Sequence, residues 1–362
     1  MAGTFTRAGA YIGPMATLAG TRTPTATLPA LGVRYDWVVI GAAAWMAAGM
    51  YWDGSAHISG LPDSFWTIWH AAFYSGFAAS ALAVLAPVVM ARPRVASWRA
   101  AIPAGYGYAV AGVFVFGIGG VFDMLWHTIF GIEFSTDALL SPTHLMLGTG
   151  AALIVSGPFV AATHRAGRHD LAGQLPAVIS LGFILGTFTF FTMYAGPYSG
   201  VLGQGPKPGD TVLVRTMLGV YLFSALIVGV ALVGLARGVL PFGSLTVILG
   251  LNGVATILMR GHAPLEVQLA FSLVAIAAGA IGDVLVWRLR PSIDRTLALR
   301  VFAFALPFAY WALYLGVVVL RLGSGWTIHE LTGIVVVSGI VGLLVSFVFT
   351  SGSRSPMTPR SL

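Results

Sequence analysis

Long apolar segments recur along the whole chain and constrain its fold more than any other feature. They fall at residues 35–52, 64–90, 104–126, 142–163, 172–195, 212–235, 241–259, 264–287, 299–321 and 328–349. A helix of about 20 apolar residues is long enough to cross the hydrocarbon core of a bilayer. With 57% hydrophobic and only 9% charged residues, the composition does not fit a soluble domain. The sequence therefore predicts an all-α polytopic membrane protein with about ten transmembrane helices.

Basic residues are concentrated on one side of the predicted membrane. That side holds 15 of the 19 Lys and Arg residues, namely Arg7, Arg22, Arg34, Arg92, Arg94, Arg99, Arg165, Arg168, Arg237, Arg288, Arg290, Arg295, Arg300, Arg354 and Arg360. Because Lys and Arg accumulate in cytoplasmic loops, we expect a multi-pass protein of the plasma membrane with both termini in the cytoplasm. The segments then pair into five hairpins whose tips point outward. The lipid bilayer is the expected partner, and nucleic-acid binding is excluded.

The spacing of the segments predicts five units along the chain. These are a cytoplasmic tail at 1–34, a four-helix unit at 35–170, a helix pair with a long outer loop at 171–240, a second four-helix unit at 241–350 and a cytoplasmic tail at 351–362. Two short matches indicate that the second four-helix unit is a degenerate repeat of the first. Trp66-Thr67-Ile68-Trp69-His70 resembles Trp326-Thr327-Ile328-His329-Glu330, and Pro142-Thr143-His144 resembles Pro264-Leu265-Glu266.

Two groups of ionisable residues stand where apolar segments meet at the predicted outer face. The first is Asp53, His57 and, after twelve residues, His70; the second is Asp123, His127 and, after sixteen residues, His144. Residues four apart share one face of a helix, and the third residue begins the returning helix. Two imidazoles and one carboxylate with open positions suit Cu(II), non-haem Fe(II) or Zn(II). Ionisable residues are costly near membrane depth, so the recurrence of this pattern favours two metal sites over isolated interfacial histidines.

A looser group of polar residues accompanies the second four-helix unit. It comprises Arg260, His262, Glu266, Arg321, His329 and Glu330, and forms either an ion-paired network or an additional metal site. The ion-paired interpretation is favoured, because an arginine beside a carboxylate competes with a cation. Asp283 is expected to pair with the nearby Arg288 and Arg290. The Gly- and Pro-rich stretch 197–211 predicts a loop, either a linker or a lid over the outer face.

Aromatic residues crowd both groups, and their default role is an interfacial belt. Trp69 and Trp126 each directly precede a candidate ligand, so these two are expected to help wall an apolar pocket beside the metal. The chain has no cysteine, which excludes thiolate metal sites, iron–sulfur clusters and covalently attached c-type haem.

The spacing Asp53-x3-His57-x12-His70 resembles the copper motif in the C subunit of the particulate methane and ammonia monooxygenase family. Asp123, His127 and His144 stand, by position, where that family has a second site. The family has Asn there in place of Asp and a thirteen-residue spacer before the last histidine. The resemblance covers about residues 35–165 and is one of motif spacing and order. It implies copper at Asp53, His57 and His70, a second copper at the downstream site, and oxygen-dependent hydroxylation of an apolar substrate.

Three functions are compatible with these observations. The leading one is a copper-dependent, monooxygenase-like oxidoreductase acting on an apolar small molecule, with iron or zinc as alternative metals, and with partner subunits or other copies of itself. The second is a metal or proton-coupled transporter or metal-handling protein, although the middle of the membrane offers little beyond Asn252 to continue a pathway. The third is a membrane haem protein, ranked lowest because the outer histidines all lie near one face.

Overall fold

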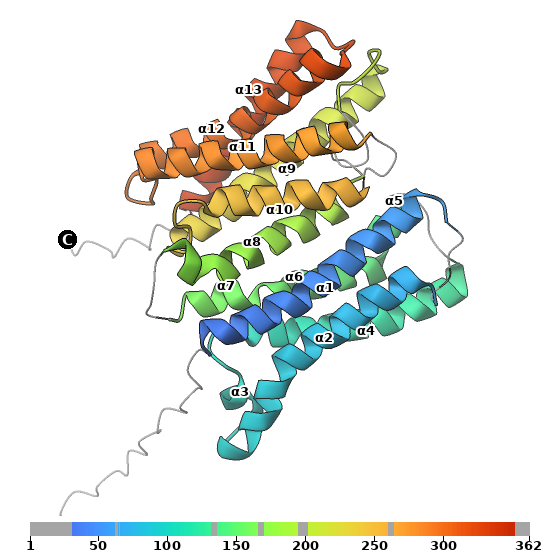
Figure 1. Cartoon of the computed structure of the whole chain (residues 1–362), viewed down its shortest axis with the longest axis vertical. Helices are drawn as coiled ribbons and strands as arrows, with labels where there is room; N and C mark the ends of the chain where they lie inside the picture. The colour runs from blue at the N-terminus through green and yellow to red at the C-terminus, as the bar shows by residue number, and fades with distance from the viewer. Residues whose placement is uncertain are drawn as a thin grey trace, which may run out of the picture.

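The computed structural model describes residues 31–61, 64, 66–131, 136–165, 170–194, 202–259 and 264–351, which form a bundle of helices (Figure 1). The longer helices are α1 (Val33–Ile58), α2 (Ile68–Ala91), α4 (Gly107–Phe130), α6 (Pro142–Val155), α8 (Leu171–Phe191), α9 (Asp210–Ala236), α10 (Ser244–Met259), α11 (Leu265–Leu289), α12 (Thr296–Val317) and α13 (Ile328–Ser351). Shorter pieces extend or connect them: η1 (Arg92–Arg94), α3 (Trp98–Ala101), α5 (Thr136–Leu140), α7 (Gly157–Ala162) and the π-helical η2 (Val318–Leu322).

All ten predicted apolar segments form helices, and the all-α polytopic membrane fold is confirmed. Within the described chain, eight helical segments are long and apolar enough to cross a membrane: Ile68–Arg94, Gly107–Phe130, Pro142–Ala162, Leu171–Phe191, Asp210–Ala236, Leu265–Leu289, Thr296–Leu322 and Ile328–Ser351. The other two predicted spans are α1 and α10. Helix α1 has 26 residues but includes Asp36 and Asp53, while α10 has only 16. Both nevertheless pack against each other and against their neighbours inside the bundle.

Four of the five predicted hairpins are confirmed as packed pairs. These are α1 with α2, α4 with α6, α10 with α11, and α12 with α13. The fifth pair differs, because α8 packs mainly on α10 and α9 packs mainly on α13. In each four-helix unit the two hairpins also meet in the same order, α2 against α4 and α11 against α12. The internal duplication remains a prediction.

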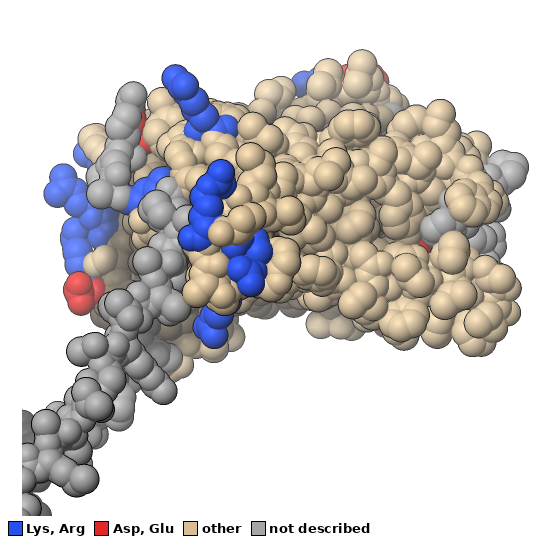
Figure 2. All heavy atoms as spheres, turned by 90° about the horizontal axis from the view of Figure 1, so that it is seen from below, with Lys and Arg blue, Asp and Glu red and all other residues tan. Residues whose placement is uncertain are grey.

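Lys and Arg side chains gather at one end of the bundle, on the left of Figure 2, where α1 begins. A buried ion pair lies at this end. Asp36 is 0% exposed, pairs with the guanidinium of Arg165 and accepts a hydrogen bond from the Tyr106 hydroxyl at 2.7 Å. Arg165 also donates to the carbonyl of Leu31 at 3.0 Å. These contacts fasten the start of α1 to the start of α4 and to the chain that follows α7.

The predicted pairing of Asp283 with Arg288 and Arg290 is wrong. The Asp283 carboxylate on α11 accepts hydrogen bonds from the backbone N–H groups of Leu245 and Thr246, both at 2.9 Å, and from the Thr246 hydroxyl at 2.6 Å. The first N–H groups of any helix lack partners within that helix, and here they belong to the buried start of α10. Asp283 therefore caps a neighbouring helix, a role that nearness in sequence to two arginines did not reveal.

Candidate metal centres

The first predicted site is assembled where α1 ends and α2 begins. Asp53 and His57 lie one turn apart near the end of α1, and His70 is the third residue of α2. The Nε2 atom of His57 lies 3.8 Å from Asp53 Oδ1, and the Nε2 atom of His70 lies 3.2 Å from the same oxygen. The hairpin thus brings all three side chains together, as their spacing predicts. We call this trio the first centre.

The second predicted site repeats this construction at the hairpin of α4 and α6. Asp123 and His127 lie near the end of α4, which closes at Gly131 with a φ of +85° that favours glycine. His144 is the third residue of α6. The Nε2 atoms of His127 and His144 lie 3.5 and 3.3 Å from Asp123 Oδ1. We call this trio the second centre.

The spacing of the donor atoms fits ligands placed around one ion. In each centre, one donor atom from every residue lies within 4.8 Å of the others, and among the described residues these two trios are the groups that meet this condition. Ligands about 2.0–2.1 Å from an ion at tetrahedral angles lie about 3.3 Å apart. A direct charge-assisted N–H···O bond would instead be about 2.7–2.9 Å long. The four Nε2–Oδ1 distances, from 3.2 to 3.8 Å, are compatible with three ligands around one ion.

Hydroxyl groups at the helix starts orient one histidine in each centre. Thr67 is the N-cap residue of α2, and its Oγ1 lies 2.9 Å from His70 Nδ1. Ser141 is the N-cap residue of α6, and its Oγ lies 2.7 Å from His144 Nδ1. A partner on Nδ1 fixes the ring plane and leaves Nε2 to face the carboxylate. At His70 the Ser64 carbonyl oxygen, which can only accept, also lies 2.9 Å from Nδ1 and selects the tautomer protonated there. These hydroxyls lie three residues before each histidine, and their role was not predicted from the sequence.

We expect Ser141→Ala to weaken ion binding at the second centre by about 10–100-fold, the usual effect of losing a partner that orients a ligand. Ion affinity measured by titration against a competing chelator checks this. Ser97→Ala is the matched control, since Ser97 is also an N-cap residue, accepting from Ala100 N at 3.1 Å, but precedes the short helix α3 and belongs to neither centre. Equal affinities in the Ser141 variant and the wild type would contradict the orienting role.

The carboxylate of the second centre is held more deeply than that of the first. Asp123 is 2% exposed, its Oδ1 accepts from the Thr143 hydroxyl and its Oδ2 accepts from the Tyr74 hydroxyl, each at 3.0 Å. The Asp53 side chain is 16% exposed. Neither hydroxyl donor was predicted from the sequence, although Thr143 adjoins His144 and Tyr74 follows His70 by one helical turn.

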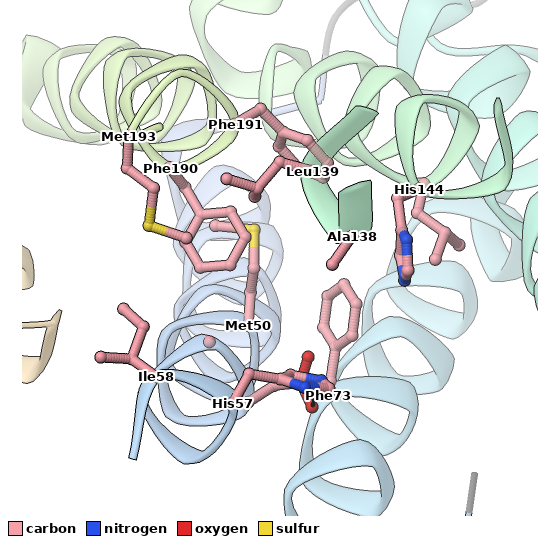
Figure 3. Close-up of a pocket in the computed structure, with 13 residues that line it drawn as sticks. Met50, His57, Ile58, Phe73, Ala138, Leu139, His144, Phe190, Phe191 and Met193 are labelled. Atoms are coloured by element: carbon pink, nitrogen blue, oxygen red, sulfur yellow. Dashed lines mark ion pairs between the residues drawn. The ribbon is translucent and has the colours of Figure 1, made fainter. Parts of the chain in front are cut away.

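A cavity of about 360 Å³ touches both centres (Figure 3). Asp53 and His57 of the first centre and His144 of the second contribute to its lining. The remaining lining is mostly apolar and comes from α1, α2, α5, α6, α8 and the turn after α8: Met50, Gly54, Ile58, Phe73, Ala138, Leu139, Leu147, Phe190, Phe191 and Met193. The aromatic wall is therefore made of phenylalanines, and the expectation that Trp69 and Trp126 form it is wrong. Trp126 packs on Phe130 instead, with ring centroids 4.6 Å apart.

Of the looser polar group predicted beside the second four-helix unit, the structure describes Glu266, Arg321, His329 and Glu330. Arg260 and His262 lie outside the described residues. Glu330 is ion-paired with Lys207, with 2.7 Å between Oε1 and Nζ, and it also accepts from the backbone N–H of Thr327 at 2.8 Å. The hydrogen bond from Lys207 to Glu330 and the negative charge of Glu330 raise the pKa of Lys207. Glu266, Arg321 and His329 belong to neither of the two metal-compatible trios.

The described part of the long outer loop is fastened to the turn between α12 and α13. Gly205 N–H donates to the Gly323 carbonyl at 3.2 Å, and Gly325 N–H donates to the Gly205 carbonyl at 2.7 Å. A side chain at Gly325 would lie 2.5 Å from the backbone nitrogen of Lys207, so this approach requires glycine. The contacts favour the linker interpretation of residues 202–209.

Comparisons of this chain with protein-family models, curated proteins and solved structures find no match. The geometry of the two centres and their shared cavity therefore carries the functional argument.

Proposed function

We propose that this chain is an integral membrane oxidoreductase that holds two copper ions, one in each centre, and uses oxygen to oxidise a small apolar molecule. The observation that carries the proposal is the convergence of two imidazole nitrogens on one carboxylate oxygen in each of two successive hairpins. Ionisable side chains at membrane depth are costly, so six of them at one end of the bundle favour a functional site there.

Copper is the metal that the donor set favours. The ligands are imidazole and carboxylate, and the chain has no thiolate to offer. Nitrogen and oxygen donors bind Cu(II) more tightly than the other common divalent metals of the first transition row. Iron and zinc accept the same donors and are the alternatives. Bound copper would supply one-electron redox chemistry at the open coordination positions of the site.

The chain's own residues select the substrate class. Phe73, Phe190 and Phe191 form much of the cavity wall, while its polar lining includes the ligands Asp53, His57 and His144. Such walls exclude water and hold an apolar molecule beside the ions. The centres lie at the end of the bundle opposite the basic residues, so we place them at the extracytoplasmic face of the plasma membrane.

Transport of a metal or of protons is the alternative, and the middle of the bundle disfavours it. Asn252 Nδ2 donates to Thr189 Oγ1 at 2.7 Å, and the Tyr51 hydroxyl donates to the Gly186 carbonyl at 2.9 Å. These groups serve packing between α1, α8 and α10. The buried acids beyond them, Asp36 and Asp283, are engaged in the structural contacts described above. Among the described residues, no continuous series of acidic or histidine side chains leads from the centres to the basic end, as a pathway for metal ions or protons would require.

Haem ligation is disfavoured by the position of the carboxylates. Axial histidines bind iron from opposite faces of a flat macrocycle. In each centre both Nε2 atoms approach one aspartate oxygen, and the ring centroids lie 5.8 Å apart in the first centre and 5.4 Å apart in the second. The aspartate oxygen takes the place that a porphyrin would need.

The test uses the full chain in lipid nanodiscs, loaded with copper and supplied with a reductant, ¹⁸O₂ and short-chain alkanes. We expect hydroxylated alkane that carries ¹⁸O and depends on added copper. Absence of a copper-dependent product would contradict the oxidoreductase assignment. Uptake of copper by the same protein reconstituted into sealed vesicles, without product in nanodiscs, would establish the transport alternative in its place.

A further inference from the structure

Tyr74 connects the two centres through a single helix. It lies on α2 one turn after His70, a member of the first centre. Its hydroxyl donates to Oδ2 of Asp123, a member of the second centre on α4, at 3.0 Å. Helix α2 thus contributes a side chain to one candidate metal site and a hydrogen-bond donor to the other.

The surroundings of Tyr74 hold its ring in place. The ring packs against Phe73 and Phe116, with centroid distances of 5.7 and 6.1 Å. On the α4 side it faces Gly120, where an added Cβ would lie 3.0 Å from the Tyr74 ring atom Cε1. The absent side chain at Gly120 lets α4 approach α2 closely enough for the hydroxyl to reach Asp123. The hydroxyl position is therefore set by packing on several sides.

We infer that Tyr74 is a positioning residue for the second centre and fixes that centre relative to the first. This inference rests on the proposed function, because it concerns how ion ligands are oriented. By donating to Oδ2, Tyr74 restricts rotation of the Asp123 carboxylate together with the Thr143 hydroxyl, which donates to Oδ1; the terminal torsion of a free carboxylate is broad. Oδ1 is then held toward the Nε2 atoms of His127 and His144. A rigid supporting contact of this kind raises affinity by reducing the reorganisation that binding requires.

The test is Tyr74→Phe, which keeps the ring and removes the hydroxyl. Copper affinity is measured against a competing chelator in a His57→Ala background, so that only the second centre is loaded. We expect the affinity of the second centre to fall by about 10–100-fold and its copper EPR spectrum to change. In a His127→Ala background, which leaves only the first centre loaded, we expect the same substitution to have no effect. Tyr51→Phe is the matched control, because that buried tyrosine bonds to the Gly186 carbonyl.

A second variant tests the positioning without deleting the hydroxyl. Gly120→Ala introduces a Cβ close to the Tyr74 ring and should displace it, so we expect a weaker second centre here also. If Tyr74→Phe fails to fold, as judged by its melting curve, Gly120→Ala decides the matter. Unchanged affinity and EPR spectrum of the second centre in the variant that folds would overturn the inference and leave the proposed function intact. A wild-type protein that binds no copper would overturn the metal centres themselves.

Discussion

Replacing His57 with alanine is expected to lower bound copper from two ions per chain to one. His57 is one of the three side chains of the first centre that could hold an ion, so its loss leaves one imidazole and one carboxylate. Loss of a residue that only supports a ligand lowers metal affinity by about 10–100-fold. We expect a larger fall in the copper affinity of the first centre, because His57 is a proposed ligand itself. The side chain lies at the cavity, 22% exposed, so its removal should disturb the fold little.

Copper content after dialysis, with EPR of the ion that remains, measures this effect. His329→Ala is the matched control, because His329 is an exposed histidine near the start of α13 and belongs to neither trio. It should retain both ions. A His57 variant that keeps two ions with an unchanged spectrum would show that the first centre is not a copper site.

Replacing Arg165 with alanine is expected to reduce the free energy of unfolding by about 3–5 kcal/mol. The reason is that Asp36, which is fully buried, would keep its hydrogen bond from Tyr106 but lose the cation beside it. An unpaired buried carboxylate is far more costly than a missing surface ion pair. Unfolding of the detergent-solubilised chain, followed by circular dichroism during denaturant titration, measures the loss.

Two further variants separate this effect from a general loss of positive charge. Arg237→Ala removes an exposed arginine that follows α9 and should change stability by less than about 0.5 kcal/mol. Adding Asp36→Asn to the Arg165 variant removes the stranded charge and should restore part of the lost stability. Equal stabilities of the Arg165 and Arg237 variants would contradict the role assigned to the buried pair.

The apolar segments and the two trios were predictable because both depend on short-range patterns. A run of apolar residues specifies a membrane helix whatever its neighbours are. An Asp and a His four residues apart share a helix face, and a short connection returns His70 or His144 to the same end of the hairpin. Local rules therefore sufficed to bring these side chains together.

Lateral packing was not predictable in the same way. Asp283 reaches across to α10, Tyr74 reaches across to α4, and α8 brings Phe190 and Phe191 to the cavity. Each contact depends on which helix lies beside which, and a nearly uniform apolar surface does not encode that choice. The same limit explains why α8 and α9 were expected to form a packed hairpin, whereas α8 lies mainly against α10.

The most direct test of the two-centre account is the copper content of the purified full chain. After loading and dialysis, the wild type should retain two ions per chain with EPR signals typical of nitrogen ligation. Asp53→Ala and Asp123→Ala should each retain one ion, and the double variant none. A wild type without copper, or a double variant that still binds two ions with the same spectrum, would contradict the account.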